Sequence, residues 1–294
     1  MIVITAPTSN IGSQVLKNVL DDGLPVRVIA RDPSRLPSAI RDHVEVVQGS
    51  HSDISVLNQA FASAETVFWL VPPDPKAKSV DAAFLDFSRP VCEAIKSQRV
   101  RRLVAVSALG RGTPLADNAG LVTASLKMCD LIANTGVSLR ALTMPSFMDN
   151  IIRQIKSIRR QGVFFSPISA DRKLPTCATR DIASVAARLL LDPSWSGQMD
   201  VPILGPEDLS FNDMALIISD VIGKQVRFQQ ISPEAYKAGF IERGVSEAIA
   251  QGMVDMAEAK NEGLDKAEPR TALTTTPTSF RQWCEQVLKP AVLR

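Results

Sequence analysis

Short apolar runs alternate with longer amphipathic stretches through the first half of the chain. The runs are rich in β-branched residues, which is typical of strands buried on both faces of a sheet. The stretches between them repeat apolar positions every three or four residues, as helices that cover a sheet do. The pattern predicts strands at 2–5, 26–30, 44–47, 66–71, 103–106 and 137–142, and helices at 11–20, 53–61, 80–95 and 121–134.

This alternation predicts the fold class. Strands that alternate with helices are joined by crossovers, and crossovers make the sheet parallel and cover both of its faces. We therefore predict an α/β protein with a doubly wound parallel sheet of the Rossmann type, with its NAD(P)-binding domain over residues 1–145.

The second half is less regular. It predicts helices at 147–158 and 181–191 and a strand at 199–204. Ser210 and Ser232 are placed to cap two further helices, because serine is a preferred N-cap residue. Pro233 follows Ser232 at the first helical position, where proline is favoured. We expect a smaller, mainly helical substrate-binding lobe over 146–294, with a segment near 170–205 that returns to the sheet.

Composition and charge exclude several classes of protein. Of the 294 residues, 45% are hydrophobic, which is enough for a large core. Thirty-three basic and thirty-one acidic residues leave a net charge of +2, too little to attract nucleic acid. No apolar run approaches the roughly 20 residues that span a bilayer. We expect no nucleic-acid or membrane partner, and a small-molecule substrate; a homodimer or a regulatory protein partner stays open.

The scarce residue types narrow the chemistry further. The four cysteines are far apart and form no CxxC pair, so we expect neither a disulfide framework nor a metal site. There are two histidines, and Tyr236 is the only tyrosine. The chain starts without a charged leader before its first apolar run, from which we expect a cytoplasmic protein.

The loop after the first predicted strand is where a Rossmann sheet binds pyrophosphate. On a GxxGxxG spacing the three positions are Ala6, Ser9 and Gly12, so only the third is glycine. A side chain at position 9 crowds the backbone and disfavours a positive φ. Ser9 and Asn10 either donate side-chain hydrogen bonds to a phosphate or only cap the first helix.

The end of the second predicted strand bears on which nucleotide is preferred. Asp or Glu at this point binds the ribose hydroxyls of NAD, but the sequence here is Ala30-Arg31-Asp32-Pro33-Ser34-Arg35. Guanidinium groups suit the 2′-phosphate of NADP. Arg31 and Arg35 therefore favour NADP(H) over NAD(H), and the alternative is that both are solvated surface arginines.

Several stretches together resemble the NmrA-like family of atypical short-chain dehydrogenases/reductases. They are VITAPTSNIG, RDPSRL, GSHSD at 49–53, VRRLVAVSALG at 100–110, TGVSLRALTMPSFMDN at 135–150, LPTCATRDIASVAARLLL at 174–191 and GPEDLSFNDMALIISDVIGKQV at 205–226. The resemblance covers nearly the whole chain. The family includes reductases of quinones, azo dyes, triphenylmethane dyes and iminium intermediates, together with regulators that bind the dinucleotide without turning it over.

The resemblance also implies roles for individual residues. It implies pyrophosphate binding by the first loop, adenine contact near the third strand, ribose contact after the fourth, and nicotinamide and substrate contact after the fifth and sixth. The pyrophosphate residues are Thr8, Ser9, Asn10 and Ile11, and the adenine residue is Asp53. The ribose residues are Leu70, Val71 and Pro72, and the nicotinamide and substrate residues are Ser107, Pro145 and Phe147. The family's usual Gly-Asp after the third strand is Gly49-Ser50 here.

The catalytic residues depart from those of ordinary short-chain dehydrogenases. Those enzymes use Tyr-x-x-x-Lys, in which the lysine lowers the pKa of the tyrosine that protonates a carbonyl. Tyr236 lies far beyond the helix that should carry this pair. The remaining catalytic candidates are Lys127, which the resemblance places near the nicotinamide ribose, and Ser107 at the end of a strand. A solvated lysine and a turn-capping serine are the alternatives.

Three functions stay open. The leading hypothesis is hydride transfer from NADPH to a conjugated, electron-poor acceptor such as a quinone, azo compound or iminium, because such acceptors need positioning more than a proton donor. The second is a non-catalytic NAD(P) sensor. The third is a redox-neutral cyclase or isomerase whose altered first loop has lost the dinucleotide.

Overall fold

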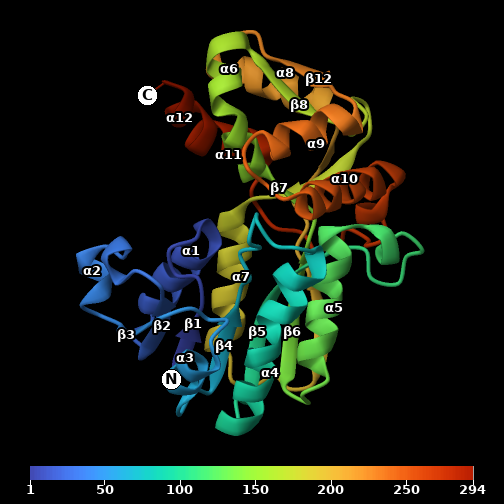
Figure 1. Ribbon diagram of the computed structural model, residues 1–294. Coiled ribbons are helices and arrows are strands. Elements are labelled where there is room, and N and C mark those ends of the chain that lie inside the picture. Colours follow the sequence, from blue (N-terminus) through green and yellow to red (C-terminus); the bar gives the residue numbers. More distant parts are fainter. Residues whose placement is uncertain (294) are drawn as a thin grey trace.

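The computed structural model describes residues 1–293 and centres on a seven-stranded sheet whose strands all run parallel (Figure 1). The strand order is β10-β6-β5-β4-β1-β2-β3, so the direction of winding reverses between β1 and β4. This order confirms the doubly wound parallel sheet. The strands are β1 Ile2–Ile4, β2 Val26–Ala30, β3 Glu45–Gln48, β4 Thr66–Trp69, β5 Arg102–Ala108, β6 Ser138–Met144 and β10 Gln198–Pro202.

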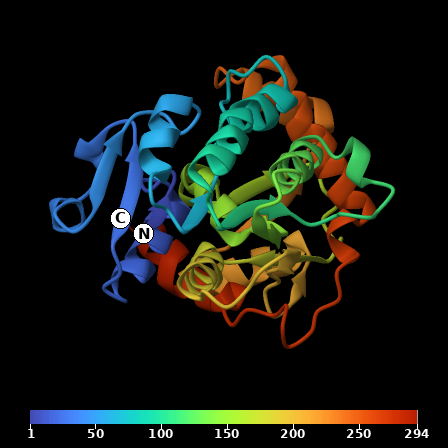
Figure 2. The ribbon, with the colours of Figure 1, turned by 90° about the horizontal axis from the view of Figure 1, so that it is seen from below.

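Helices cover both faces of this sheet (Figure 2). Successive side chains of a strand point to opposite faces, and in β1 Val3 packs into one buried cluster while Ile2 and Ile4 pack into the other. The Val3 face is covered by α3 Ile54–Phe61, α4 Phe87–Gln98 and α5 Leu121–Ala133, and the other by α1 Asn10–Leu20 and α7 Thr179–Leu191. A short helix, α2 Ser38–Arg41, lies between β2 and β3.

The helix predicted over 80–95 is present, and its winding changes along its length. A π-helical turn, η2 Ala82–Asp86, precedes α4, and Pro90 lies inside α4. Proline has no N–H, and its ring clashes with the carbonyl group four residues earlier, which here belongs to Asp86. The wider turn ends at that residue, so the local geometry follows from Pro90.

The second lobe packs around its own core, which contains Phe164, Ile218 and Trp283. It contains two small sheets, one of β11-β9-β7 and one of β12-β8. Its strands are β7 Ser146–Phe147, β8 Val163–Ser166, β9 Leu174–Cys177, β11 Asp208–Leu209 and β12 Arg227–Gln230, and its α-helices are α6 Ile155–Gln161, α8 Phe211–Ile222, α9 Pro233–Ile241, α10 Glu247–Glu262, α11 Phe280–Trp283 and α12 Lys289–Leu293.

The segment predicted as a helix over 147–158 differs in the structure. Ser146 and Phe147 form β7, a 3-10 helix η4 covers Met148–Gln154, and α6 follows. The backbone of β7 pairs with Thr176 and Cys177 of β9, so these residues are extended. Apolar spacing alone does not show this pairing, because the partner strand lies about 30 residues further along the chain.

The chain returns to the main sheet after β9. α7 packs against α1, and β10 then pairs in parallel with β6 over the register Gln198↔Leu139 to Pro202↔Thr143. The predicted caps are present, since Ser210 Oγ accepts from Asp213 N and Ser232 Oγ accepts from Ala235 N. None of the helices within residues 1–293 is long and apolar enough to cross a membrane.

Candidate functional site

The residues implied by the resemblance lie at the carboxyl ends of the strands in the main sheet. The first loop follows β1, Arg31 follows β2, Asp53 lies beyond β3, and Leu70 directly follows β4. Ser107 lies near the end of β5, and Pro145 and Phe147 follow β6. In a doubly wound sheet a ligand binds at this edge, beside the reversal of strand order, which here falls between β1 and β4.

Thr5 joins the two strands that flank this reversal. Its hydroxyl donates to the carbonyl oxygen of Phe68 at 2.9 Å and accepts from the N–H of Leu70 at 3.0 Å. Thr5 is fully buried. The hydroxyl therefore satisfies backbone groups of β4 at the point where the chain leaves the sheet, and it fixes the spacing between the first loop and Leu70.

The first loop makes the tight turn of a dinucleotide fingerprint without its first two glycines. Ala6 has a φ of 48°, in the left-handed region that glycine favours. At Gly12 an added Cβ would lie 2.1 Å from the carbonyl oxygen of Ala6. Glycine is thus required at position 12, and Ala6 adopts the left-handed conformation that usually needs a glycine.

Ser9 is the N-cap of α1. Its hydroxyl accepts from the N–H of Gly12 at 3.0 Å and donates to the carbonyl oxygen of Ala6 at 2.8 Å. The capping alternative is therefore what the side chain does in this structure. The N–H groups of Asn10 and Ile11 have no acceptor within residues 1–293. These two donors lie at a helix N-terminus, where anions bind, and Thr8 beside them is exposed.

The side chain of Asn10 is bonded at both ends. Its Nδ2 donates to Asp149 Oδ1 at 3.1 Å, and its Oδ1 accepts from Gln14 Nε2 at 3.0 Å. Asp149 belongs to η4 of the second lobe. Asn10 thus links the first loop to the second lobe, and its backbone N–H rather than its amide is free for a phosphate.

The end of β2 carries positive charge at the surface. Arg31 and Arg35 are both exposed, and neither guanidinium has a hydrogen-bond acceptor or an ion-pair partner within residues 1–293. Asp32 between them is the cap of a 3-10 turn, η1 Pro33–Arg35. Hydrogen bonds from the side chain and backbone of Ser34 lower the pKa of Asp32. The carboxylate is therefore held by the turn, and the two arginines stay free.

Asp53 is the N-cap of α3. Hydrogen bonds from the hydroxyl and backbone N–H of Ser55 lower the pKa of its exposed carboxyl group. Ser50 and Ser52 bond each other through their hydroxyls at 2.8 Å. The polar groups after β3 therefore engage one another, and the adenine contact of Asp53 stays a prediction.

His51 lies buried beside these residues and was not among the candidates from the sequence. Its Nε2 lies 3.1 Å from the carbonyl oxygen of Leu70, so this nitrogen carries the proton. The ring meets Trp69 and Phe87 edge to face. Burial lowers its pKa to about 4, and the charge of Arg31 acts in the same direction. A neutral histidine thus holds the Leu70 carbonyl in place.

The residues after β4 lie beside the first loop, since the N–H of Leu70 is bonded to Thr5. Leu70 and Val71 are buried and Pro72 is exposed. The segment that follows is bonded to the second lobe, since Ser246 donates from its N–H to Pro75 O at 2.8 Å and from its hydroxyl to Ala77 O at 2.7 Å.

Ser107 is a buried hydroxyl near the end of β5. It is 6% exposed, and its Oγ has no nitrogen or oxygen partner within residues 1–293. An unsatisfied buried hydroxyl costs free energy, and an active site is one place where such groups occur. Cys129 of α5 lies beside it, and burial raises the pKa of that thiol to about 12. A hydroxyl without a partner near the expected nicotinamide fits a polar atom of a ligand.

Lys127 lies on α5 and is exposed, whereas its neighbours Leu126 and Met128 are buried. Thr123 stands one helical turn before it, in the place of the tyrosine of Tyr-x-x-x-Lys. The hydroxyl of Thr123 donates to Ala116 O at 2.7 Å and accepts from Ala119 N at 2.8 Å. That hydroxyl supports the preceding loop, and the catalytic role of Lys127 stays a prediction.

Phe147 and Tyr236 lie in the second lobe. Phe147 is half-buried in β7, directly beyond Pro145 and β6. Tyr236 is on α9, where it packs against Ile168 and Leu174 and meets Phe240 edge to face. Burial raises the pKa of Tyr236. The only tyrosine is therefore part of the lobe's packing and lies on a different element from α5.

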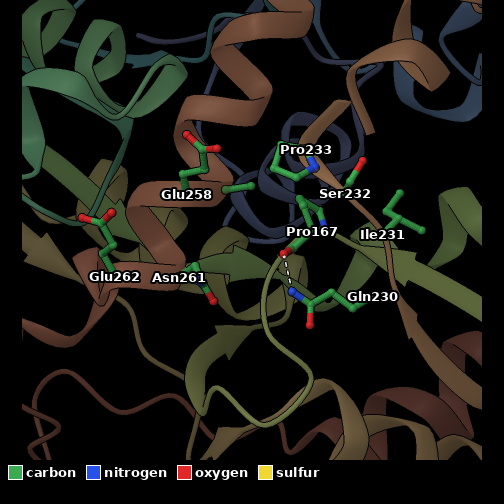
Figure 3. A pocket seen from close by; sticks show the side chains of 9 residues that line it. Pro167, Gln230, Ile231, Ser232, Pro233, Glu258, Asn261 and Glu262 are labelled. Carbon is green, nitrogen blue, oxygen red and sulfur yellow. Dashed lines mark hydrogen bonds between the residues drawn. The ribbon is translucent and has the colours of Figure 1, made fainter. Parts of the chain in front are cut away.

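A separate cavity of about 670 Å³ lies in the second lobe, between the end of β12 and the last turns of α10 (Figure 3). Its polar side includes Glu258, Asn261 and Glu262, and Ile231 and Pro233 are among its apolar residues. None of the residues predicted for the dinucleotide site lines it. Within residues 1–293 no group of three or more acidic, cysteine or histidine side chains is arranged to hold a metal ion.

The strand order and the helices on both faces of the sheet define a Rossmann-type α/β protein. A model of NAD(P)H-binding proteins matches residues 8–193, and a model of the NmrA-like family matches residues 132–285. The chain therefore belongs to the NmrA-like family, as its sequence motifs predicted.

Similar proteins cover nearly the whole chain. One is the (4-alkanoyl-5-oxo-2,5-dihydrofuran-3-yl)methyl phosphate reductase of Streptomyces griseus, 27% identical over 96% of each chain. Another is the NAD(P)H azoreductase of Xenophilus azovorans, 25% identical over 87% of this chain and 86% of its own. A solved structure of NADPH-dependent quinone oxidoreductase from Escherichia coli, complexed with NADPH, has the same fold, with a TM-score of 0.80, 20% identity, and coverage of 98% and 100%.

Proposed function

We propose that this protein is an NADPH-dependent reductase that transfers hydride to a conjugated, electron-poor small molecule of the quinone, azo or iminium type. The observation that carries the proposal is the first loop. Although two fingerprint glycines are replaced, Ala6 keeps the left-handed turn and Gly12 keeps the close backbone approach. The N–H groups of Asn10 and Ile11 are free at the start of α1 within the described residues.

The side chains along the strand ends fit such a dinucleotide. Asn10 and Ile11 would hold its pyrophosphate through backbone N–H groups, assisted by the positive end of the helix dipole. Arg31 and Arg35 would hold the 2′-phosphate, since both are exposed and unpaired within residues 1–293. Ser107 would meet the nicotinamide end with its unsatisfied hydroxyl. Arginine–phosphate bonds are charge-assisted, and they support NADP(H) over NAD(H).

The chain's own part in the reaction is positional. When bound, NADPH supplies the hydride. Leu70 and Val71 would line the ribose, and the turn around Phe147 would exclude water and orient the acceptor. Ser107 donates a hydrogen bond to a polar atom beside the reacting centre. An acceptor that delocalises the incoming electron pair needs no dedicated acid, which fits a helix α5 without tyrosine.

Nucleotide titration tests this function. NADPH should raise the melting temperature of the purified protein more than NADH does, and its fluorescence should change on binding. NADPH oxidation is then followed against a quinone, an azo compound and an iminium. If neither nucleotide binds, the dinucleotide site is refuted. If NADPH binds but no acceptor in the panel is reduced, the hydride-transfer reaction is refuted and the sensor hypothesis is favoured.

A further inference from the structure

The first loop and the second lobe are joined by a closed ring of hydrogen bonds. Asn10 Nδ2 donates to Asp149 Oδ1 at 3.1 Å, and Thr179 N donates to Asp149 Oδ2 at 3.1 Å. Gln14 Nε2 completes the ring, since it lies 3.1 Å from Thr179 Oγ1 and 3.0 Å from Asn10 Oδ1. The four residues come from three elements, α1, η4 and α7.

Asp149 is the member of this ring that the second lobe contributes. Both of its partners are donors, so both carboxylate oxygens must be acceptors. An amide at this position has a single acceptor oxygen and places an N–H group against one of the two donors. The position therefore requires a carboxylate, although within residues 1–293 no basic side chain pairs with it.

The electrostatic partners of this carboxylate are helix N-termini. Thr179 is the first residue of α7, and Asn10 is the first residue of α1. The positive ends of two helix dipoles thus meet at Asp149, which offsets the missing cation. The same end of α1 carries the free N–H groups of Asn10 and Ile11, so the carboxylate and the expected pyrophosphate share one helix terminus.

Asp149 is also connected to the expected nicotinamide end of the site. It lies two residues after Phe147, and Thr179 lies two residues after Cys177. Phe147 and Cys177 are paired across β7 and β9. The carboxylate therefore fastens both strands, just beyond their paired ends, to the loop that would hold the pyrophosphate.

We propose that Asp149 is a positioning residue that couples the pyrophosphate loop to the Phe147 turn. Cofactor binding at one end of the site then fixes the position of Phe147 beside the substrate at the other end. The inference rests on the proposed NADPH-dependent function. It assigns a role in cofactor affinity and in turnover to a side chain that touches neither reacting atom.

The test compares Asp149→Asn with Gln154→Ala in the full-length protein. Gln154 lies on the same 3-10 helix and makes two hydrogen bonds, to the N–H of Phe165 at 2.8 Å and to its carbonyl oxygen at 2.9 Å, which stay within the second lobe. Both variants lose bonds of η4 and should melt at lower temperature. Only Asp149→Asn should raise the KM for NADPH and lower kcat, each by about tenfold, as expected for one lost hydrogen bond to a charged group.

A double variant separates positioning from a merely structural role. In Asn10→Asp/Asp149→Asn the ring can reform with its charge moved. The new carboxylate at position 10 accepts from Gln14 and from the new amide at position 149, and the oxygen of that amide accepts from Thr179 N. The melting temperature should recover toward wild type. kcat should recover as well, because the reformed ring again fastens the first loop to the Phe147 turn. The KM for NADPH should stay high, because the negative charge now lies at the first residue of α1, against the pyrophosphate.

The outcomes are distinct. If wild type binds NADPH and Asp149→Asn has the kinetic constants of Gln154→Ala, the coupling is refuted and the proposed function stands. If the double variant regains stability but not kcat, the reformed ring does not set the position of the Phe147 turn and the coupling is refuted. If wild type does not bind NADPH, the proposed function and the coupling fail together.

Discussion

Gly12→Ala tests the first loop most directly, because the change adds one methyl group at a defined place. The new Cβ would lie 2.1 Å from the carbonyl oxygen of Ala6 and 2.9 Å from its carbonyl carbon. Both atoms belong to the backbone, so no rotamer change relieves the contact. Either α1 or the turn at Ala6 must move.

The size of the movement follows from the distance. Ordinary contacts of a Cβ begin at 3.4 Å, so the atoms are more than 1 Å too close. A displacement of about 1 Å at a binding loop costs on the order of 100-fold in function, and overpacking costs about 1–3 kcal/mol of stability. We expect Gly12→Ala to bind NADPH about 100-fold more weakly and to melt at lower temperature.

The matched control is Gly239→Ala. Gly239 lies in α9, has no atom within 4 Å of its added Cβ and has no left-handed φ. Alanine there should raise stability by roughly 0.5–1 kcal/mol and leave NADPH binding unchanged. The measurement is a fluorescence titration with NADPH beside thermal denaturation. A Gly12→Ala protein that remains folded and binds NADPH as wild type does would show that this loop does not hold the dinucleotide.

Four further predictions concern residues at and around the candidate site. Arg31→Ala should weaken NADPH binding by about 10–100-fold and leave NADH binding unchanged, as expected for a charge-assisted bond to the 2′-phosphate. The control is Arg41→Ala, since Arg41 is exposed and its loss should alter neither dissociation constant. Equal losses of affinity for both nucleotides would contradict the role of Arg31. The pKa of His51 falls from 6.5 to about 4 on folding, so the unfolded chain binds the extra proton first. The stability it contributes should be complete above pH 6.5 and lost as the pH falls toward 4, by about 3 kcal/mol in urea titrations, and His51→Phe should remove this part of the slope. Ser107→Ala should lower kcat/KM about tenfold. Lys127→Met tests the other catalytic candidate. A lower kcat at unchanged NADPH affinity would assign Lys127 a role in the reaction, and an unchanged kcat would place Lys127 on the solvent face.

The strands, the helices and the doubly wound fold class follow from local sequence patterns. Each strand carries its own apolar run and each helix its own spacing, so residues such as Val3 and Ile4 determine their faces without distant information. The caps at Ser210 and Ser232 are equally local, because a cap acts on the N–H groups of the next turn. These predictions are confirmed for that reason.

The partners of the site residues depend on contacts between distant segments. Asn10 and Asp149 are 139 residues apart, and no periodicity connects them. His51 lies inside a polar GSHSD stretch, and its burial arises only when Trp69 and Phe87 close around it. Ala6 shows that a conformation can persist after its usual residue is lost, which a comparison of residue types does not reveal.

The return of the chain to the sheet has a consequence for the order in which the protein can fold during synthesis. α1 is made first, yet the helix that covers it, α7, is made only after about 160 further residues. Until Ile182 and Ala186 leave the ribosome, the side of α1 that packs against α7 has no cover, and β6 keeps an open edge until β10 arrives. Contacts this distant in sequence are slow to close. A nascent chain halted near residue 145 should therefore bind chaperones more strongly than the full-length chain does.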